Sequence, residues 1–374
     1  MIERVCSSCF ADQDLRRWVR AQNGNRGCDA CKGFDSPTCK IEDICGKIQE
    51  SLERYWGFAV DQLPYESAEG GYQGATWSTW EILLDEAGLE LPRDRSDRLL
   101  YAILSHLKDE VWCEYDWLTL DTDEALKLGW NRFCEVIKHK KRFFFHDEGV
   151  DDRDSYSPKT LLKAIASSCE NLGLIGQLPS GTTLWRARTD LRKGIRHTSH
   201  DFGPPPLVHA IQSNRMNPPG IPMLYLASSV PTALKETRAR AGHVGRWRLL
   251  QPLRILDLRA LPEVPGIFSD DHRSDRLTLR FLHHFARDIM QPVARDQRTH
   301  IDYLPSQVVT EYLRDYNFKS SKLDGIAYAS TVNPRGWNLA LFSSRLELGL
   351  VAPEWYEKGF KQVAEFAGSK TAKL

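Results

Sequence analysis

Two CxxC pairs near the amino terminus constrain the fold more than any other feature of the chain. Cys6 and Cys9 form the first pair, Cys28 and Cys31 form the second, and 18 residues separate the pairs. Each pair spaces two thiolates for one tetrahedral ion, so two pairs complete a four-thiolate site. Six of the nine cysteines fall in the first 45 residues, which favours a metal over a dispersed disulfide framework. The pattern predicts structural zinc in a zinc-ribbon-like segment, residues 1–40.

Free thiols in a flexible tail are the alternative to this metal site. Cys39 and Cys45 either extend the site or, in the case of Cys45, pack on the following helix. Residues 23–27, NGNRG, form the expected turn into the second pair. Because so small a segment buries little apolar core, metal binding would supply its folding energy. Four thiolates leave the ion no open position, so we expect the site to be structural and not catalytic.

Residues 41–148 carry the spacing of an α-helical domain. Apolar side chains repeat at three- and four-residue intervals, the pattern of helices with one buried face. The three stripes are Ile44, Ile48, Leu52, Tyr55, Trp56 and Ala59; Leu99, Leu100, Ile103, Leu104, Leu107 and Val111; and Leu126, Trp130, Phe133, Val136 and Ile137. We therefore expect helices from residue 44 to about residue 145, with a glycine-containing loop at 64–74.

The pattern of apolar residues changes after residue 157. The polar, acidic stretch 149–157 is the predicted linker, and Ser157-Pro158 opens a helix expected to run to Leu172. Short apolar strands then alternate with short helices, which predicts an α+β domain over residues 158–355, followed by a tail over 356–374. We expect strands at 183–187, 221–227, 326–329 and 339–342, paired strands within 247–258, and helices at 232–241, 277–290 and 306–316.

Bulk composition argues against several classes of protein. Lys plus Arg equals Asp plus Glu at 50 each, so a nucleic acid partner is left open but is not favoured. The longest apolar run, residues 99–104, is far too short to span a bilayer. The amino terminus is charged from its third residue and lacks the apolar stretch of a signal peptide. We therefore expect a cytosolic protein, whose thiols stay reduced.

Residues 213–236, SNRMNPPGIPMLYLASSVPTALKE, concentrate residue types suited to a dinucleotide. The stretch joins Arg215, a rigid Pro-Pro-Gly turn, an apolar strand carrying Tyr225 and a helix carrying Glu236. A guanidinium binds phosphate oxygens, and a carboxylate stabilises developing positive charge. The combination suits a ligand that joins a pyrophosphate, a ribose and a flat cationic ring, a description that fits NAD.

This stretch resembles the second motif of the RES domain, a family named for its arginine, glutamate and serine. Four further motifs stand around it in the family's order, over roughly 160 residues: 184–188 (LWRAR), 303–307 (YLPSQ), 324–330 (DGIAYAS) and 338–342 (NLALF). The resemblance implies a split mixed sheet related to that of ADP-ribosyltransferases, with NAD in its cleft. The whole chain is then multidomain: a zinc ribbon, an α-helical domain and an α+β RES domain.

The resemblance also implies roles on the binding side of the site. Arg186 and Arg215 would bind the pyrophosphate, and Arg188 is a reserve candidate two residues along the strand. Tyr225 would lie against the nicotinamide and its ribose. The alternatives are surface salt bridges for the arginines and plain core packing for the tyrosine.

Glu236 is the residue on which the chemistry would depend. Breaking the N-glycosidic bond of NAD creates positive charge at the ribose anomeric carbon, which a nearby carboxylate stabilises. The alternative is a helix-surface glutamate paired with Arg240 at i,i+4. Ser330 would bind a phosphate or the ribose, or is simply a turn residue. Asn338 and Gln307 are further candidates for the site.

The helical block resembles the HEPN-type domain that sometimes precedes RES domains. Catalytic members of that superfamily use an arginine and a histidine a few residues apart to cleave RNA, and Arg132 and His139 have such a spacing. The family's polar residue after the arginine is replaced here by Phe133. We therefore interpret the domain as a non-catalytic module for partner binding or self-assembly, with RNA cleavage as the alternative.

The resemblance implies a toxin that depletes cellular NAD, passing ADP-ribose to water or to phosphate as co-substrate. RES toxins are usually neutralised by a helix-turn-helix antitoxin that blocks the cleft. The extra front half suggests a regulatory or sensing module, which motivates the hypothesis of a role in phage defence. Two alternatives stay open: ADP-ribosyl transfer to a macromolecule, and a nucleic-acid-binding or RNA-cleaving protein with an inactive RES domain. The acceptor, the antitoxin, the trigger and any homo-oligomer are undetermined.

Overall fold

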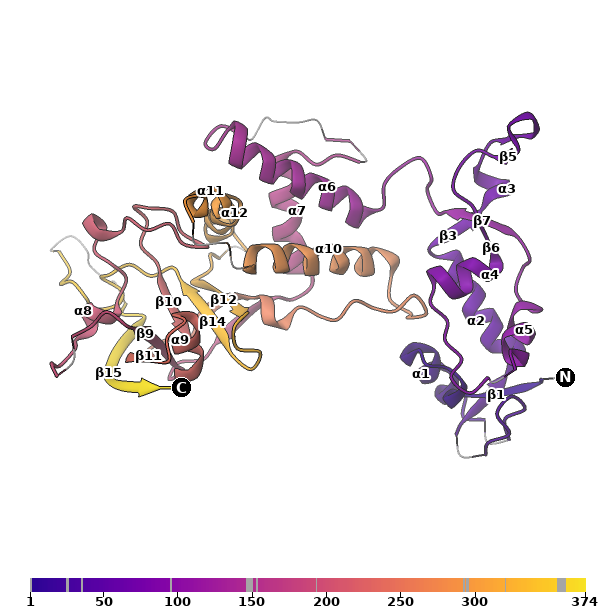
Figure 1. Cartoon of the computed structure of the whole chain (residues 1–374), viewed down its shortest axis with the longest axis horizontal. Helices are drawn as coiled ribbons and strands as arrows, with labels where there is room; N and C mark the ends of the chain where they lie inside the picture. Colours follow the sequence, from indigo (N-terminus) through magenta and orange to yellow (C-terminus); the bar gives the residue numbers. More distant parts are fainter. Residues whose placement is uncertain are drawn as a thin grey trace. The chain divides into compact units, whose positions relative to one another are not determined.

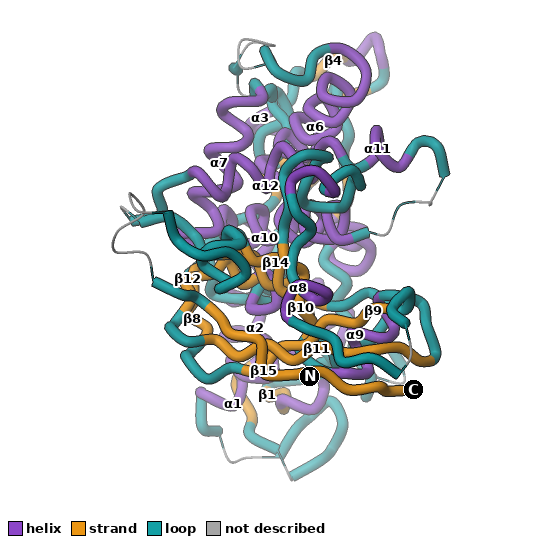
Figure 2. The backbone as a smooth tube through the Cα atoms, turned by 90° about the vertical axis from the view of Figure 1, so that its left-hand side faces the viewer, coloured by secondary structure: helices purple, strands orange, loops and turns teal. Residues whose placement is uncertain are grey.

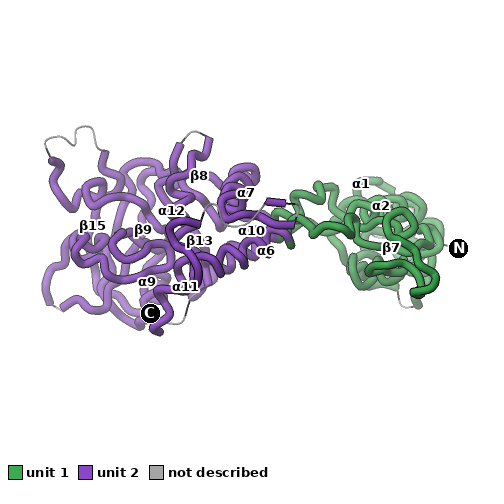
Figure 3. The backbone as a smooth tube through the Cα atoms, turned by 90° about the horizontal axis from the view of Figure 1, so that it is seen from above, with its two compact units in different colours: residues 1–124, 263–280 green, residues 125–262, 281–374 purple. Residues whose placement is uncertain are grey.

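The computed structural model of the chain consists of two compact units. It describes residues 2–24, 27–34, 36–94, 96–145, 151–152, 154–192, 194–291, 293, 296–319, 321–354 and 361–374. Unit 1 comprises residues 1–124 and 263–280, and unit 2 comprises residues 125–262 and 281–374 (Figure 3). Figure 1 labels the helices α6 (Thr122–Glu135) and α10 (Arg273–Met290), and the unit boundaries at residues 124 and 280 fall within their residue ranges.

Unit 1 opens with the cysteine-rich segment. Strand β1 (Arg4–Cys6) pairs antiparallel with β2 (Thr38–Lys40), and the turn η1 (Ser7–Cys9) and helix α1 (Gln13–Ala21) lie between them in sequence. Asp12 caps α1 by accepting hydrogen bonds from the backbone amides of Asp14 and Leu15, both at 2.9 Å. This region is therefore a short two-stranded antiparallel sheet with one capped helix between its strands in sequence.

The helices of unit 1 are shorter than the stripes predicted. Helix α2 (Ile41–Glu53) ends before Tyr55, and α5 (Arg98–Leu104) ends before Val111. The residues beyond these ends form a three-stranded sheet of β3 (Trp56–Phe58), β7 (Val111–Glu114) and β6 (Trp77–Ser78). An all-helical middle is therefore wrong here, because aromatic and β-branched residues pair as strands and bury Trp112 completely.

The smaller elements of unit 1 cluster around residues 59–86. They are α3 (Ala59–Gln62), the hairpin of β4 (Tyr65–Glu66) and β5 (Gly71–Tyr72), η2 (Ser67–Glu69), α4 (Thr79–Glu81) and a π-helical turn η3 (Ile82–Glu86). Gly70 and Gly71 both have positive φ angles, at 93° and 136°, and so allow the tight hairpin. This hairpin occupies the loop predicted at 64–74.

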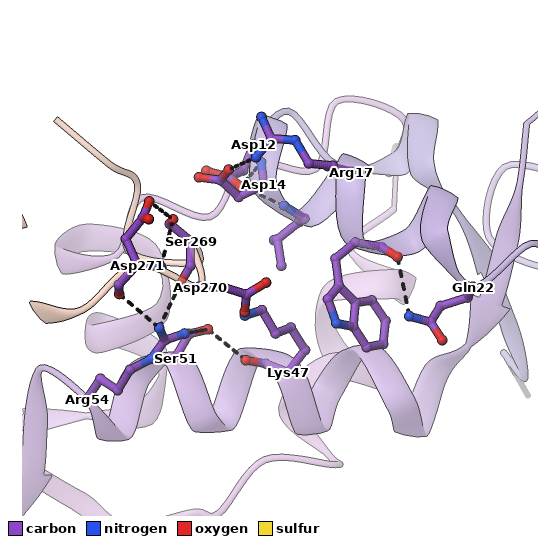
Figure 4. Close-up of polar contacts among 12 residues, drawn as sticks. Asp12, Asp14, Arg17, Gln22, Lys47, Ser51, Arg54, Ser269, Asp270 and Asp271 are labelled. Carbon is purple, nitrogen blue, oxygen red and sulfur yellow. Dashed lines mark hydrogen bonds and ion pairs between the residues drawn. The ribbon is translucent and has the colours of Figure 1, made fainter. Parts of the chain in front are cut away.

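A segment from far along the chain completes unit 1. Phe268 is buried in the core that holds α2 and α5. Beside it, Lys47 donates to Asp270, and Arg54 donates to the backbone oxygens of Ser269 at 2.7 Å and Asp271 at 3.4 Å (Figure 4). Residues 263–280 therefore belong to the fold of unit 1, although they follow the first half of unit 2 in sequence.

Unit 2 is built on an eight-stranded mixed sheet. The strand order is β15-β11-β9-β10-β14-β13-β12-β8, and all neighbours are antiparallel except β12 and β13. The strands are β8 (Ile175–Leu178), β9 (Thr183–Arg188), β10 (Leu224–Ala227), β11 (Ala241–Leu249), β12 (Leu253–Asp257), β13 (Gly325–Ala329), β14 (Trp337–Leu341) and β15 (Ala364–Lys373). Strands β9 and β10 share a single registered pair, Trp185 with Ala227, so the sheet divides at that point.

The longer helices of unit 2 cover one face of this sheet (Figure 2). Helices α7 (Pro158–Asn171), α10 and α12 (Leu304–Asp315) bury a shared apolar core against β12, β13 and β14. The opposite face packs around Leu226, Trp247 and Leu339, with Phe202 from α8 (Ser199–Phe202). The α+β class predicted for this part of the chain is confirmed.

Several boundaries differ from the predictions. Helix α9 (Val230–Glu236) ends five residues before the predicted residue 241, and β11 starts there instead. Strands β11 and β12 are not neighbours, so the paired strands expected within 247–258 are wrong. Strand β15 lies in the segment 356–374 that we set apart as a tail, and it pairs with β11 along the sheet edge.

The start of α7 follows its sequence signals. Ser157 caps the helix by accepting from the Thr160 amide at 3.3 Å, and Pro158 occupies the first turn. Of the predicted linker 149–157, residues 149, 150 and 153 lie outside the described residues. The remaining short elements of unit 2 are the π-helical turn η4 (Val136–Lys140), η5 (Leu207–His209), η6 (Leu258–Ala260) and α11 (Thr299–Asp302). Across the described parts of the chain, no helix combines the length and apolar character needed to cross a membrane.

Candidate active site

Three of the predicted site residues meet at one carboxylate oxygen. Oε1 of Glu236 accepts a hydrogen bond from Ser330 Oγ at 2.7 Å and another from Asn338 Nδ2 at 2.6 Å. Glu236 is the last residue of α9, Asn338 lies on β14, and Ser330 directly follows β13. Among the described residues no hydrogen bond reaches Oε2, and Arg240 forms no ion pair with Glu236. One carboxylate oxygen is thus held in place and the other is available.

Ser330 is oriented by a turn of its own. Its hydroxyl accepts from the backbone amides of Val332 at 3.4 Å and Asn333 at 3.1 Å while it donates to Glu236. The Asn333 side chain donates to Thr232 on α9 at 2.8 Å, which ties the same turn to the helix of Glu236. Because its proton is committed to Glu236, Ser330 orients the carboxylate in this structure.

Tyr328 was not assigned a role by the sequence, although it stands in the motif ending at Ser330. It faces the site because it pairs in register with Asn338 across β13 and β14. The Arg215 guanidinium carbon lies 5.8 Å from the Tyr328 ring centroid, a cation–π distance. Burial raises the pKa of Tyr328 to about 12, while Arg215 opposes and Glu236 adds to the shift. The phenol therefore stays neutral, with Arg215 and Glu236 both near it.

Arg186 carries a buried donor without an acceptor. Its Nη1 atom is buried and has no hydrogen-bond partner among the described residues. Burial lowers the pKa of Arg186 to about 9, with a smaller lowering by Arg188 and an opposing effect of Tyr225. Arg186 as a whole is half-buried, but a donor withdrawn from water without a partner is costly. An anionic ligand at this position would relieve that cost. Arg188 instead donates from Nε to the Asp201 carbonyl at 3.2 Å.

Tyr225 has both hydrogen-bonding positions of its hydroxyl occupied. The hydroxyl donates to Asn217 Oδ1 at 2.7 Å and accepts from the Met216 amide at 3.2 Å. Burial raises the pKa of Tyr225, so the phenol stays neutral. Tyr225 therefore contacts the loop that carries Arg215, and its partly buried ring packs against the core of unit 2.

The four paired cysteines meet as one cluster in unit 1. The Sγ atoms of Cys6, Cys9, Cys28 and Cys31 all lie within 4.8 Å of one another. Measured separations are 3.7 Å for Cys6–Cys9 and 3.6 Å for both Cys6–Cys31 and Cys9–Cys28. Tetrahedral zinc with bonds of about 2.3 Å requires sulfur separations of about 3.8 Å. The cluster thus has the donors and the size for one zinc ion.

The other early cysteines stay apart from this cluster. Cys39 lies on β2 and Cys45 on α2, where its Sγ lies 3.9 Å from the Ile103 carbonyl of α5. Burial raises the pKa of each of these two thiols to about 12. Arg93 approaches the cluster instead, with Nη1 4.0 Å from Cys31 Sγ. Its charge would offset part of the negative charge of a four-thiolate zinc site.

The arginine–histidine pair of the helical region forms no site in the described residues. Arg132 lies on α6 and donates to Ser155 at 2.7 Å, while His139 lies on η4. Phe133, which follows the arginine, is buried in the core of unit 2. No contact joins Arg132 to His139 among the residues described.

Two family models match separate parts of the chain. Residues 183–356 match the family model of the RES domain. The chain contains a RES domain. Residues 21–151 match HEPN/RES N-terminal domain 1, so a helical N-terminal region of a known kind precedes the RES domain. Arg186, Arg215, Glu236, Ser330 and Asn338 all fall within the RES match.

Comparisons with individual proteins add less. A solved structure, the M. tuberculosis MbcT–MbcA toxin–antitoxin complex, is 13% identical and covers 56% of this chain and 93% of that chain. Its TM-score is 0.26, which is too low to indicate a shared fold. No curated protein matches the chain.

Proposed function

We propose that the RES domain cleaves NAD at the bond between nicotinamide and ribose. The observation that carries this proposal is the half-buried carboxylate of Glu236, fixed through Oε1 by Ser330 and Asn338 with Oε2 available. A fixed anion beside a carbon that becomes cationic lowers the barrier without reorganisation during the reaction.

The leaving group suits a site with one carboxylate. The nicotinamide ring of NAD is positively charged, so it takes the bonding electron pair as it departs and becomes neutral. No acid is needed to protonate it. The ribose carbon then carries the positive charge, which Glu236 stabilises until an acceptor oxygen bonds from the other side. Water as acceptor gives ADP-ribose and a proton. Phosphate as acceptor gives ADP-ribose that carries the phosphate on the same ribose carbon.

Arg186 and Arg215 supply positive charge for the pyrophosphate in this proposal. The unpartnered Nη1 of Arg186 offers a buried donor, and charge-assisted bonds from guanidinium groups to phosphate oxygens are strong. Arg215 stands over Tyr328, on the same side of the sheet as Asn338. In the same proposal the ring of Tyr225 contacts the nicotinamide end of the substrate.

We extend the proposal to a toxin restrained by a partner or by unit 1. RES-type activity that depletes NAD would harm the cell that contains it, so a restraint is required. Candidates are an antitoxin of the helix-turn-helix kind and the front half of the chain with its four-cysteine cluster. Zinc bound there would hold β1 and the second cysteine pair together, a structural task. A role in phage defence remains a hypothesis that rests on this architecture.

Turnover of NAD by the purified full chain tests the proposed function. Wild type, Glu236→Gln and the control Glu263→Gln would be compared with and without phosphate, because Glu263 is exposed and lies outside the site. We expect rapid loss of NAD in wild type and in the control, and almost none in Glu236→Gln. If NAD labelled in its ADP-ribose part left label on protein or nucleic acid, the result would instead support ADP-ribosyl transfer. Equal loss in all three proteins would exclude Glu236 as the catalytic group.

A further inference from the structure

The position of the Arg215 side chain depends on its backbone. Its guanidinium forms no hydrogen bond or ion pair with the described residues, and its contact is with the ring of Tyr328 at 5.8 Å. Long side chains of this kind lose much conformational freedom when they are ordered. Arg215 is therefore placed by the loop from which it projects, residues 213–217.

Helix α12 holds that loop through a buried amide. Gln307 is 3% exposed, and its Nε2 donates to Ser213 Oγ at 2.8 Å, to the Asn214 carbonyl at 2.7 Å and to the Asn217 carbonyl at 3.2 Å. One amide group thus reaches both ends of a five-residue loop. Because Gln307 lies in the first turns of α12, the loop is fixed to a packed helix.

Two hydroxyl groups complete the attachment. Ser306 Oγ donates to the carbonyl of Arg215 itself at 2.6 Å. From β10, the Tyr225 hydroxyl accepts from the Met216 amide and donates to the Asn217 side chain. The amide of Asn214 also donates to the Asn217 carbonyl at 3.0 Å, which closes the loop on itself. Helix α12 and strand β10 therefore hold the loop from separate elements.

We propose that Gln307 is a positioning residue for substrate binding, which acts by holding residues 213–217 so that Arg215 faces the pyrophosphate. The inference rests on the proposed function, since it assigns Gln307 to the same NAD site. Sites whose binding groups are locked by a second layer of hydrogen bonds lose affinity when that layer is removed. Gln307 therefore affects binding of NAD through Arg215 and not the chemistry at Glu236.

The variant Gln307→Glu tests this with little change in shape. A carboxyl group has one donor hydrogen when protonated and none when ionised, so it cannot replace the bonds that the amide gives to Ser213, Asn214 and Asn217. We expect the KM for NAD to rise about tenfold, which corresponds to about 1.4 kcal/mol, with a much smaller change in kcat. Gln212→Glu is the matched control, because Gln212 is exposed, lies next to the loop and undergoes the same change of charge.

A double-mutant cycle separates a positioning role from a general loss of structure. If Gln307 acts through Arg215, Gln307→Glu should raise KM in the wild-type background and have little further effect in Arg215→Ala. Additive effects of the two substitutions would overturn the inference, as would an unchanged KM in Gln307→Glu.

A smaller substitution covers the case in which Gln307→Glu does not fold. Ser306→Ala removes one hydroxyl from the Arg215 carbonyl, and we expect a rise of a few-fold in KM with kcat retained. A fall in kcat alone would contradict the proposal. Absence of both NAD turnover and NAD binding in wild type would be the failure of the proposed function itself, a result distinct from wild-type turnover with unaltered variants.

Discussion

The hydroxyl of Ser330 donates to Oε1 of Glu236 over 2.7 Å, although 94 residues separate them in sequence. The same hydroxyl accepts from the amides of Val332 and Asn333, so its proton has one direction available. Ser330 therefore holds the carboxylate through Oε1 and leaves Oε2 without a bond from a described residue. In this structure Ser330 therefore binds Glu236, and its hydroxyl hydrogen is not available to a substrate.

Removal of this hydroxyl should slow the reaction. A hydrogen bond to a charged group is worth roughly 1.5–3 kcal/mol, so Ser330→Ala should lower kcat about 10- to 100-fold. Ser369→Ala is the control, because Ser369 is exposed on β15. Steady-state assays of NAD loss measure the effect. A kcat equal to wild type would show that the Ser330–Glu236 bond has no part in catalysis.

Tyr328 should act through its ring and not through its hydroxyl. Tyr328→Phe retains the face against Arg215, whereas Tyr328→Leu removes a cation–π contact worth about 0.5–2 kcal/mol. We therefore expect an unchanged KM for NAD in Tyr328→Phe and a several-fold rise in Tyr328→Leu. Burial raises the pKa of Tyr328 to about 12, so the phenol stays neutral below that pH. The assignment would be wrong if the rate of wild type changed with pH near pH 9 or 10 and the rate of Tyr328→Phe did not.

The four-cysteine cluster should hold one zinc ion per chain. Metal analysis of the purified protein gives the stoichiometry, and cobalt substitution should produce the absorption of a tetrahedral thiolate site. Cys9→Ser should lose the metal and lower the thermal stability of unit 1, because metal binding contributes folding energy. Cys134→Ala should keep it, because Cys134 lies outside the cluster. A metal-free protein with normal stability would restore the interpretation as free thiols.

Unit 1 should depend on residues that follow the first half of unit 2 in sequence. Phe268→Ala opens a cavity in the core of unit 1 and should cost about 3–5 kcal/mol, measured by denaturant unfolding. Phe34→Ala is the matched control, since that ring is 81% exposed. Equal stability of the two variants would mean that residues 263–280 do not complete the core. By the same reasoning, a fragment starting at Tyr156 would leave Phe268 without its partners.

Local patterns predicted the parts of the protein that depend on near neighbours. The CxxC spacing predicted which four cysteines meet, because each pair is set by one turn of backbone. The Ser157-Pro158 signal predicted the start of α7, because the capping serine and the proline lie at the first turn of that helix. The motif resemblance also pointed to Glu236, Ser330 and Asn338, but it did not say that the last two bind the same oxygen of the first.

Tertiary structure decided what depends on distant segments. Pairing of 56–58 with 111–114 overrode a helical pattern, because cross-strand burial of Trp112 outweighs local periodicity. Tyr328 enters the site only through its register with Asn338, and Gln307 reaches the Arg215 loop only through the packing of α12. Phe268 belongs to a core whose other buried members all lie between residues 2 and 112. Such contacts carry no local signal, because burial is shared between segments that the sequence alone does not place together.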